Sequence, residues 1–259
     1  MGEVTFTDVS KRFSLRVDGE LHHVQALDRV SFTVSDGEIV ALIGPSGCGK
    51  TTALRVAMGL DPASAGRVTV DGREVRGCGY DRGMVFQHAE LLPWFTAMQN
   101  VMFGLEMKGM HGQPLRATAE KYIELVGLAG SKNRRPHQLY GGMKQRVGIA
   151  RALAIDPKVL LMDEPFGALD AQTRESLQAE LLDIHARTKK TILFVTHDLD
   201  EAVLLADRVI VMKDGRVAEI MAVPLARPRP DLSIVRGLPE FNDTRYKVWR
   251  ALHDETTVH

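Results

Sequence analysis

The segment from Gly44 to Thr51 carries the residue types that bind phosphate groups. It runs Gly-Pro-Ser-Gly-Cys-Gly-Lys-Thr, which fits the template of glycine, four residues, glycine, lysine and serine or threonine. Glycines let successive backbone N–H groups turn towards phosphate oxygens, and a following helix directs its positive end at them. Lys50 would reach the β- and γ-phosphates, and the Thr51 hydroxyl would ligate Mg²⁺. The predicted phosphate-binding residues are Gly44, Pro45, Ser46, Gly47, Cys48, Gly49, Lys50, Thr51 and Thr52.

Two carboxylates follow the apolar run from Val159 to Met162. If that run is a buried strand, Asp163 and Glu164 lie at the carboxyl edge of a sheet beside the phosphate loop. Asp163 suits the Mg²⁺ shell, and Glu164 suits the polarisation of an attacking water. Taken alone, the pair is typical of a solvated turn; the phosphate loop favours the catalytic interpretation.

Cys48 lies inside the phosphate loop. A positive helix end could lower the pKa of its thiol and make it oxidisable. The other interpretation, a small residue that fills space, is the one we favour from the sequence.

The flanking sequence predicts elements that position these groups. Apolar residues alternate with polar ones around Val4 and Phe6, and again from Val30 to Val34, which indicates strands with one buried face. The polar stretch from Arg16 to His23 between them is predicted to be a loop. Further predictions are strands at Ile39–Ile43 and Met84–Phe86, a helix over Lys50–Met58, and hairpin turns at Asp71-Gly72 and Asp214-Gly215.

From Leu91 to Leu153 the apolar residues recur at helical spacing, which indicates a helical insert. Short apolar runs at Val159–Met162, Ile192–Val195 and Val209–Met212 then alternate with helical stretches such as Ala171–His185. Strands alternating with helices imply a parallel sheet covered on both faces.

The fold class is therefore α/β: a P-loop NTPase with a mixed or parallel central sheet, an N-terminal antiparallel β subdomain and an inserted helical subdomain. The predicted parts are 1–90, the first part of the nucleotide-binding core; 91–155, the helical subdomain; 156–223, the second part of the core; and 224–259, a C-terminal tail.

The amino-acid composition limits which partners and locations are expected. The 259 residues contain 33 basic and 33 acidic side chains, so no global field concentrates nucleic acid. Two cysteines suit a reducing compartment, and the first ten residues lack the features of a signal peptide. No apolar run approaches the roughly 20 residues that span a bilayer. We expect another chain to supply the membrane part if the protein works at a membrane.

The stretch from Leu139 to Arg146, Leu-Tyr-Gly-Gly-Met-Lys-Gln-Arg, resembles the signature of the ATP-binding cassette (ABC) ATPases, the ATP-binding subunits of ABC transporters. Other motifs of that family follow in order. They are Gln87 in Val-Phe-Gln, the segment Gly167-Ala168-Leu169-Asp170, and Thr196-His197-Asp198. Phe13 stands where such proteins commonly carry an aromatic residue that stacks on adenine.

The resemblance implies a role for each motif. ATP would lie between two copies of the protein, or this chain and a paralogue, with Gly141 and Gly142 of one copy closing on the nucleotide held by the other. Gln87 would sense Mg²⁺ and the attacking water. His197 would contact the γ-phosphate, and Asp170 would organise the dimer interface.

Tyr140 departs from the family, which has serine there. A serine hydroxyl can cap the helix and meet the γ-phosphate, whereas a tyrosine ring would crowd the nucleotide unless it rotates aside. We expect ATP still to bind, and dimer closure or turnover to be weaker than with serine.

The segments Glu90–Thr96, Asn100–Glu106 and Leu199–Val203 look like the nitrate, sulfonate and taurine importer branch, as does the Arg-Pro-Arg stretch at 227–229. This implies a peripheral subunit on the cytoplasmic face of the bacterial inner membrane, with a separate permease and, indirectly, a solute-binding protein. The permease would dock near Gln87 and Trp94. The apolar side chains of Leu91, Leu92, Trp94 and Phe95 would then be partly exposed; alternatively they belong to the core of the insert.

Two further functions stay open at this point. The ATPase could serve an exporter or lipid transporter, because direction resides in the membrane chain. Or the chain could be a nucleotide-binding regulatory subunit, for which Tyr140 is the only support.

Overall fold

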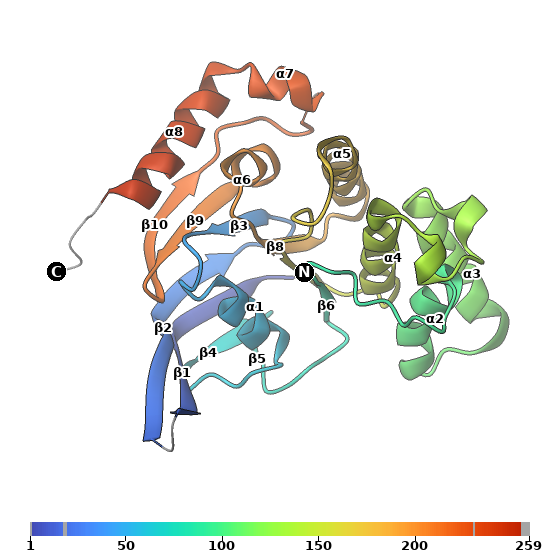
Figure 1. Cartoon of the computed structure of the whole chain (residues 1–259), viewed down its shortest axis with the longest axis horizontal. Helices are drawn as coiled ribbons and strands as arrows, with labels where there is room; N and C mark the ends of the chain where they lie inside the picture. The colour runs from blue at the N-terminus through green and yellow to red at the C-terminus, as the bar shows by residue number, and fades with distance from the viewer. Residues whose placement is uncertain (1, 18–19, 230, 255–259) are drawn as a thin grey trace. The chain divides into compact units, whose positions relative to one another are not determined.

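The computed structural model describes residues 2–17, 20–229 and 231–254. Contacts divide the chain into two compact units. Unit 1 comprises Met1–Cys78 and Thr191–His259, and unit 2 comprises Gly79–Lys190. Figure 1 traces both units along the chain.

Unit 1 contains an antiparallel sheet with the strand order β2-β1-β4-β5. Its strands are β1 (Val4–Val17), β2 (Glu20–Val34), β4 (Ala65–Val70) and β5 (Arg73–Glu74). Alternate side chains of β1 and β2 are buried, and the rings of Phe6 and Phe32 stack with centroids 4.3 Å apart. The predicted antiparallel subdomain and the hairpin at Asp71-Gly72 are confirmed.

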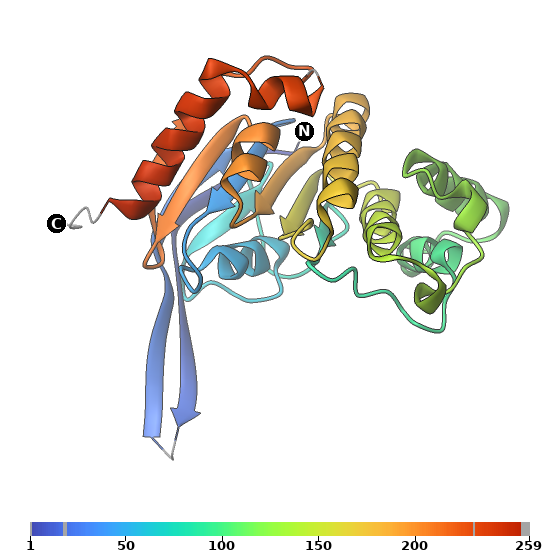
Figure 2. The same ribbon diagram turned by 45° about the horizontal axis from the view of Figure 1, so that its top comes forward.

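The predicted loop from Arg16 to His23 is wrong. β1 and β2 stay paired to their ends, with Ser14 opposite His23, Arg16 opposite Leu21 and Val17 opposite Glu20. This part of the hairpin projects from the rest of unit 1 (Figure 2). It is polar because both of its faces meet solvent, so a loop and an exposed strand pair have the same composition. Residues 18 and 19 lie outside the described part.

The other strands of unit 1 follow the order β10-β9-β3-β8. They are β3 (Ile39–Ile43), β8 (Thr191–Val195), β9 (Arg208–Lys213) and β10 (Arg216–Ala222). β3 is parallel to both β8 and β9, and β9 pairs antiparallel with β10 around Asp214-Gly215, as predicted. Helix α1 (Lys50–Met58) lies on one face of these strands and α6 (Leu199–Leu205) on the other (Figure 1).

The tail contains two helices that the sequence did not predict, α7 (Leu232–Arg236) and α8 (Pro239–His253). α8 runs beside β9 and β10 and also contacts α6 (Figure 2). Its inner face buries Phe241, Thr244 and Val248.

Unit 2 holds one parallel strand pair and a group of helices. The strands are β6 (Arg82–Val85) and β7 (Val159–Asp163). β6 begins two residues before the predicted start. The apolar pattern did not include Arg82, which is buried in the strand with its guanidinium bonded to the Asp81 carboxylate. The helices are α2 (Ala97–Met107), α3 (Gly112–Leu125), α4 (Gly141–Ala154) and α5 (Ala171–Thr188), with 3₁₀ turns η1 (Ala129–Ser131) and η2 (Pro136–Gln138). The helical character predicted from Leu91 to Leu153 is confirmed.

Among the helices in the described ranges, none combines the length and apolar character that a bilayer crossing requires.

Candidate functional site

The glycine-rich loop of unit 1 joins β3 to α1 and has the backbone shape of a phosphate cradle. Gly47 and Gly49 have φ of 81° and 101°, in the left-handed region, which glycine adopts without steric cost. Gly49 is the N-cap of α1, and no side chain caps this helix end. The first-turn N–H groups and the positive end of the helix dipole therefore suit an anion.

The neighbouring backbone holds this loop tightly. A Cβ on Gly44 would lie 2.2 Å from the Met212 carbonyl oxygen, and a Cβ on Gly49 would lie 2.3 Å from that of Ala26. The Gly215 N–H donates to the Cys48 carbonyl at 3.2 Å. Positions 44 and 49 therefore have no room for a side chain. The close backbone contacts and the bond from Gly215 hold the loop in place.

Lys50 lies along the inside of the loop and is only 7% exposed. Its Nζ donates to the carbonyl oxygens of Gly44 at 2.7 Å and Pro45 at 2.9 Å. The ammonium is thus held by the first two residues of the loop, while the next residue, Thr51, is exposed.

Cys48 is a buried filler of the loop rather than a reactive thiol. Its side chain is 4% exposed, and burial raises the pKa of the thiol despite the nearby Lys50 ammonium. The structure therefore contradicts the lowered pKa that an oxidisable thiol needs.

His197 belongs to the same unit as the phosphate loop. It follows β8, whose Val195 pairs with Leu42 of β3, so the loops after both strands start at the same edge of the sheet. The Thr196 hydroxyl donates to the buried carboxylate of Glu201 at 2.6 Å. The Asp198 side chain caps α6 by accepting hydrogen bonds from the backbone N–H groups of Asp200 and Glu201. His197 is thereby held between a strand end and a capped helix, with its own side chain exposed.

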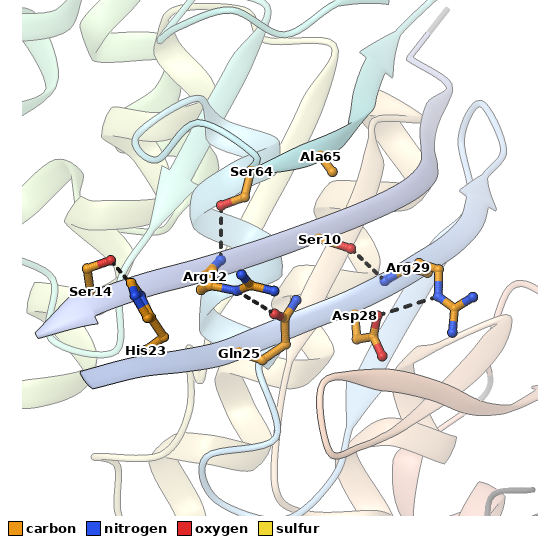
Figure 3. A pocket seen from close by; sticks show the side chains of 9 residues that line it. All are labelled: Ser10, Arg12, Ser14, His23, Gln25, Asp28, Arg29, Ser64 and Ala65. Carbon is orange, nitrogen blue, oxygen red and sulfur yellow. Dashed lines mark hydrogen bonds and ion pairs between the residues drawn. The ribbon is translucent and has the colours of Figure 1, made fainter. Parts of the chain in front are cut away.

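Phe13 is half-buried on β1, and the Lys11 ammonium lies 4.9 Å from its ring centroid. Arg12 and Ser14, its neighbours, point to the opposite face of the strand and line a concavity of about 580 Å³ (Figure 3). There Arg12 bonds to Gln25, and Ser14 to His23. Because these polar groups satisfy one another, we assign the concavity no ligand.

In unit 2 the structure brings Gln87 and Glu164 together. The Gln87 amide donates to Glu164 Oε2 at 3.3 Å. Glu164 has φ of 44° directly after Asp163, the last residue of β7, and its carbonyl accepts from the Gly167 N–H at 3.1 Å. A left-handed non-glycine residue is strained, and such strain is typical of functional sites.

Two side chains of α4 hold the Gln87 loop, and neither is a predicted site residue. Gln145 donates to the Phe86 carbonyl at 3.0 Å. Arg151 donates to the carbonyls of Ala89 at 2.7 Å and Glu90 at 2.8 Å, and burial lowers its pKa. Gln145 lies within the quoted signature stretch, but no spacing in the sequence points to Arg151.

The signature stretch starts α4, with Tyr140 as the N-cap residue. The residue is 80% exposed and its side chain makes no capping hydrogen bond, unlike the serine that the family has at this position, whose hydroxyl can cap the helix. A Cβ on Gly142 would lie 2.2 Å from Thr173 Cγ2 of α5. Asp170 caps α5 by accepting from the Thr173 N–H at 3.0 Å, and hydrogen bonds from Thr173 lower the pKa of that carboxyl.

The segment from Leu91 to Thr96 exposes apolar surface. Trp94 is 64% exposed, and Leu91, Leu92 and Phe95 are half-buried. The buried side chain of Asn100 fixes this segment, since it bonds to both backbone groups of Leu92 and to the carbonyl of Thr96. An adjoining concavity of about 410 Å³ is lined in part by Gln87–Leu91.

A glycine cradle after a parallel strand, a strand-end carboxylate held by a glutamine, and a Gly-Gly helix start together define the ATP-binding cassette class of P-loop ATPases. Comparison with known proteins agrees: the family model "ABC transporter" matches residues 27–167. The chain belongs to the ABC transporter family and is an ABC ATPase, with the cassette fold predicted from its sequence.

Relatives of this chain match it along most of its length. An uncharacterized ABC transporter ATP-binding protein of Methanocaldococcus jannaschii is 51% identical, over 90% of this chain and 86% of that protein. A nitrate import ATP-binding protein of Synechocystis is 49% identical, over 91% of this chain and 89% of that protein. A solved structure of an ATP-binding cassette, a dimer in a post-hydrolysis state with ADP and Pi, shares 34% identity with a TM-score of 0.75, covering 85% of this chain and 98% of that one.

Proposed function

We propose that this chain hydrolyses Mg-ATP at sites shared between two cassettes, and that hydrolysis drives import of a small anionic solute through a separate permease. The observation that carries the proposal is the pairing of Gln87 with Glu164 on a strained strand end.

The phosphate loop is the part of the chain that binds the nucleotide. The first-turn N–H groups of α1 and the Lys50 ammonium suit the β- and γ-phosphates. Lys50 reaches them by exchanging its bonds to Gly44 and Pro45 for charge-assisted ones. Phe13, half-buried in the same unit, offers a ring face for adenine.

Thr51, Gln87 and Asp163 are the residues that would hold Mg²⁺. Thr51 is an exposed residue in the first turn of α1, and Asp163 ends β7 half-buried. These oxygen donors fit a cation that takes its remaining ligands from phosphate and water. When bound, Mg²⁺ neutralises charge on the phosphates.

Glu164 is the proposed general base. Its carboxylate accepts a hydrogen bond from a water and polarises it towards the γ-phosphate. Gln87 holds Oε2 of this carboxylate through its side-chain amide. His197 is proposed to donate a hydrogen bond to the γ-phosphate. The residues on either side of it are held in place, Thr196 by its bond to Glu201 and Asp198 as the cap of α6.

The second copy would contribute the start of its α4. Gly141 is exposed, and without side chains at 141 and 142 the helix N–H groups can approach a phosphate closely. The solved relative is a dimer with ADP and Pi, which supports this arrangement. Asp170, which caps the neighbouring α5, is proposed to lie at the dimer interface.

The solute class rests on similarity to importer subunits. The relative from Synechocystis is named for nitrate import, and the exposed Trp94, in the same unit as Gln87, suits a permease helix. The chain would then work on the cytoplasmic face of the membrane, with a solute-binding protein on the other side.

The test is transport in proteoliposomes that contain this chain, the permease encoded beside it and the accompanying solute-binding protein. We expect ATP-dependent uptake of one of nitrate, taurine or a related sulfonate, and no uptake when the chain carries Glu164→Gln. ATP-dependent movement outwards would instead favour an exporter. Full transport with Glu164→Gln would contradict the catalytic assignment.

A further inference from the structure

The C-terminal tail holds both ends of α6, the helix that follows His197. α6 has seven residues, and its last four are fully buried. The tail supplies part of that cover, because both α7 and α8 contact α6. These contacts all lie within unit 1.

Two tail arginines bind the C-terminal end of α6. Arg227 donates to the Leu205 carbonyl at 2.6 Å, and Arg229 donates to those of Ala206 at 2.7 Å and Leu204 at 3.3 Å. The last carbonyls of a helix have no partner within it, and cations there are favoured by the helix dipole. Arg229 is partly buried, and burial lowers its pKa to about 10, which leaves it charged at neutral pH.

Arg227 also connects this end of α6 to the strand before the phosphate loop. Its Nε donates to Asp207 Oδ1 at 2.6 Å, and Asp207 Oδ2 accepts from the Ile39 N–H at 2.9 Å. Ile39 is the first residue of β3. The end of α6 is therefore fixed relative to the strand that leads into the glycine cradle.

The other end of α6 is held by α8. Arg245 donates to Asp200 Oδ1 at 2.5 Å, and Asp200 lies in the first turn of α6. The Asp200 N–H in turn donates to Asp198 Oδ1 at 2.8 Å. A chain of contacts thus runs from the tail to the residue next to His197.

We propose that the tail positions His197: Arg227 and Arg229 fix the end of α6, Arg245 fixes its first turn, and α6 fixes the loop that carries the histidine. This rests on the proposed role of His197 at the γ-phosphate. Arg227, Arg229 and Arg245 are positioning residues that touch no nucleotide.

The first test is hydrogen exchange on the full-length protein. In Arg229→Ala and Arg245→Ala, we expect the amides of residues 197–205 to exchange faster than in the wild type, and those of α1 to be unchanged. The matched control is Arg250→Ala. Arg250 is an exposed arginine on α8, the helix that carries Arg245, and its ion pair with Asp254 at 3.2 Å stays within the tail. Exchange that is the same in all three variants would overturn the proposal.

The second test is a double-mutant cycle on ATP hydrolysis by the full-length protein. Arg229→Ala should lower kcat about tenfold by misplacing His197, with KM for ATP nearly unchanged because the phosphate loop is intact. Arg229→Lys should recover part of the lost kcat, because lysine keeps the positive charge but cannot reproduce the several N–H donors of the guanidinium group. In a His197→Ala background the Arg229→Ala substitution should have no further effect.

Losses that multiply in the double variant would show that the tail does not act through His197. If His197→Ala alone leaves kcat unchanged, the proposed role of the histidine fails instead. Hydrogen exchange then still reports whether the tail holds its loop.

Discussion

At the scale of single residues, Tyr140 is the departure from the family pattern that is most open to a direct test. It occupies the N-cap of α4 with its ring exposed and its hydroxyl not used for capping. A serine at an N-cap accepts a hydrogen bond from an N–H group of the first turn and stabilises the helix by about 1 kcal/mol.

We predict that Tyr140→Ser raises ATP turnover in the assembled complex and leaves ATP binding unchanged. In the proposed arrangement the phosphate loop binds the nucleotide, whereas position 140 acts at the partner's nucleotide. Steady-state ATPase rates and calorimetric binding of ATP check this. Equal turnover by the two proteins would contradict the expectation that Tyr140 weakens turnover.

Cys48 gives a second prediction at this scale. Burial raises its thiol pKa, so the thiolate fraction at a given pH is smaller than for an ordinary cysteine, and the reagent has little access. Cys78 is exposed in the same protein and serves as the internal control.

With iodoacetamide at pH 8, we expect Cys78 to be alkylated and Cys48 to stay unmodified in the native protein, with ATP affinity retained. In denaturant both should react. Peptide mass spectrometry reads out both sites. Rapid modification of native Cys48 would contradict the burial seen here.

At the scale of elements, α4 links two parts of the site in unit 2. Its first residues are the Gly-Gly signature, and further along Gln145 and Arg151 bind the backbone of the loop that carries Gln87. This helix therefore sets where Gln87 stands relative to Glu164.

We predict that Arg151→Met lowers kcat about tenfold or more by releasing the Gln87 loop, with little change in KM for ATP. Hydrogen exchange of residues 86–91 should rise in the same variant. Arg187→Ala is the control, because Arg187 makes an exposed i,i+4 ion pair on α5. A KM increase without loss of kcat would mean that Arg151 supports nucleotide binding instead.

The elements also show what a sequence can reveal. β3, α1 and β7 were predictable because a short apolar run or a motif fixes each of them locally. The hairpin beyond Phe13 was missed because exposed strands have a loop-like composition, and α7 and α8 because they depend on contacts with α6, β9 and β10.

The same holds within the site. Residues of the phosphate loop and the strand-end carboxylates follow a fixed spacing, so the sequence predicts them. Arg151, Arg227 and Arg229 act through hydrogen bonds to carbonyls of segments that are distant in the sequence. Such bonds are set by tertiary packing, which spacing does not encode.

At the scale of the whole molecule, the chain carries two sets of groups. Unit 1 has the phosphate loop and His197, and unit 2 has Glu164, Gln87 and the signature. Membership of the ABC family makes the chain an ATPase. The proposed dimer, in which the signature of one copy meets the phosphate loop of another, predicts that specific ATPase activity rises with protein concentration.

Glu164→Gln tests the central claim most directly. The amide keeps the size of the side chain but cannot act as a base, so ATP turnover by the full-length protein should fall about 100-fold or more. Mg-ATP should still bind, and a nucleotide-bound dimer should accumulate on size-exclusion chromatography. Turnover close to that of the wild type would contradict the assignment of Glu164 as the catalytic base.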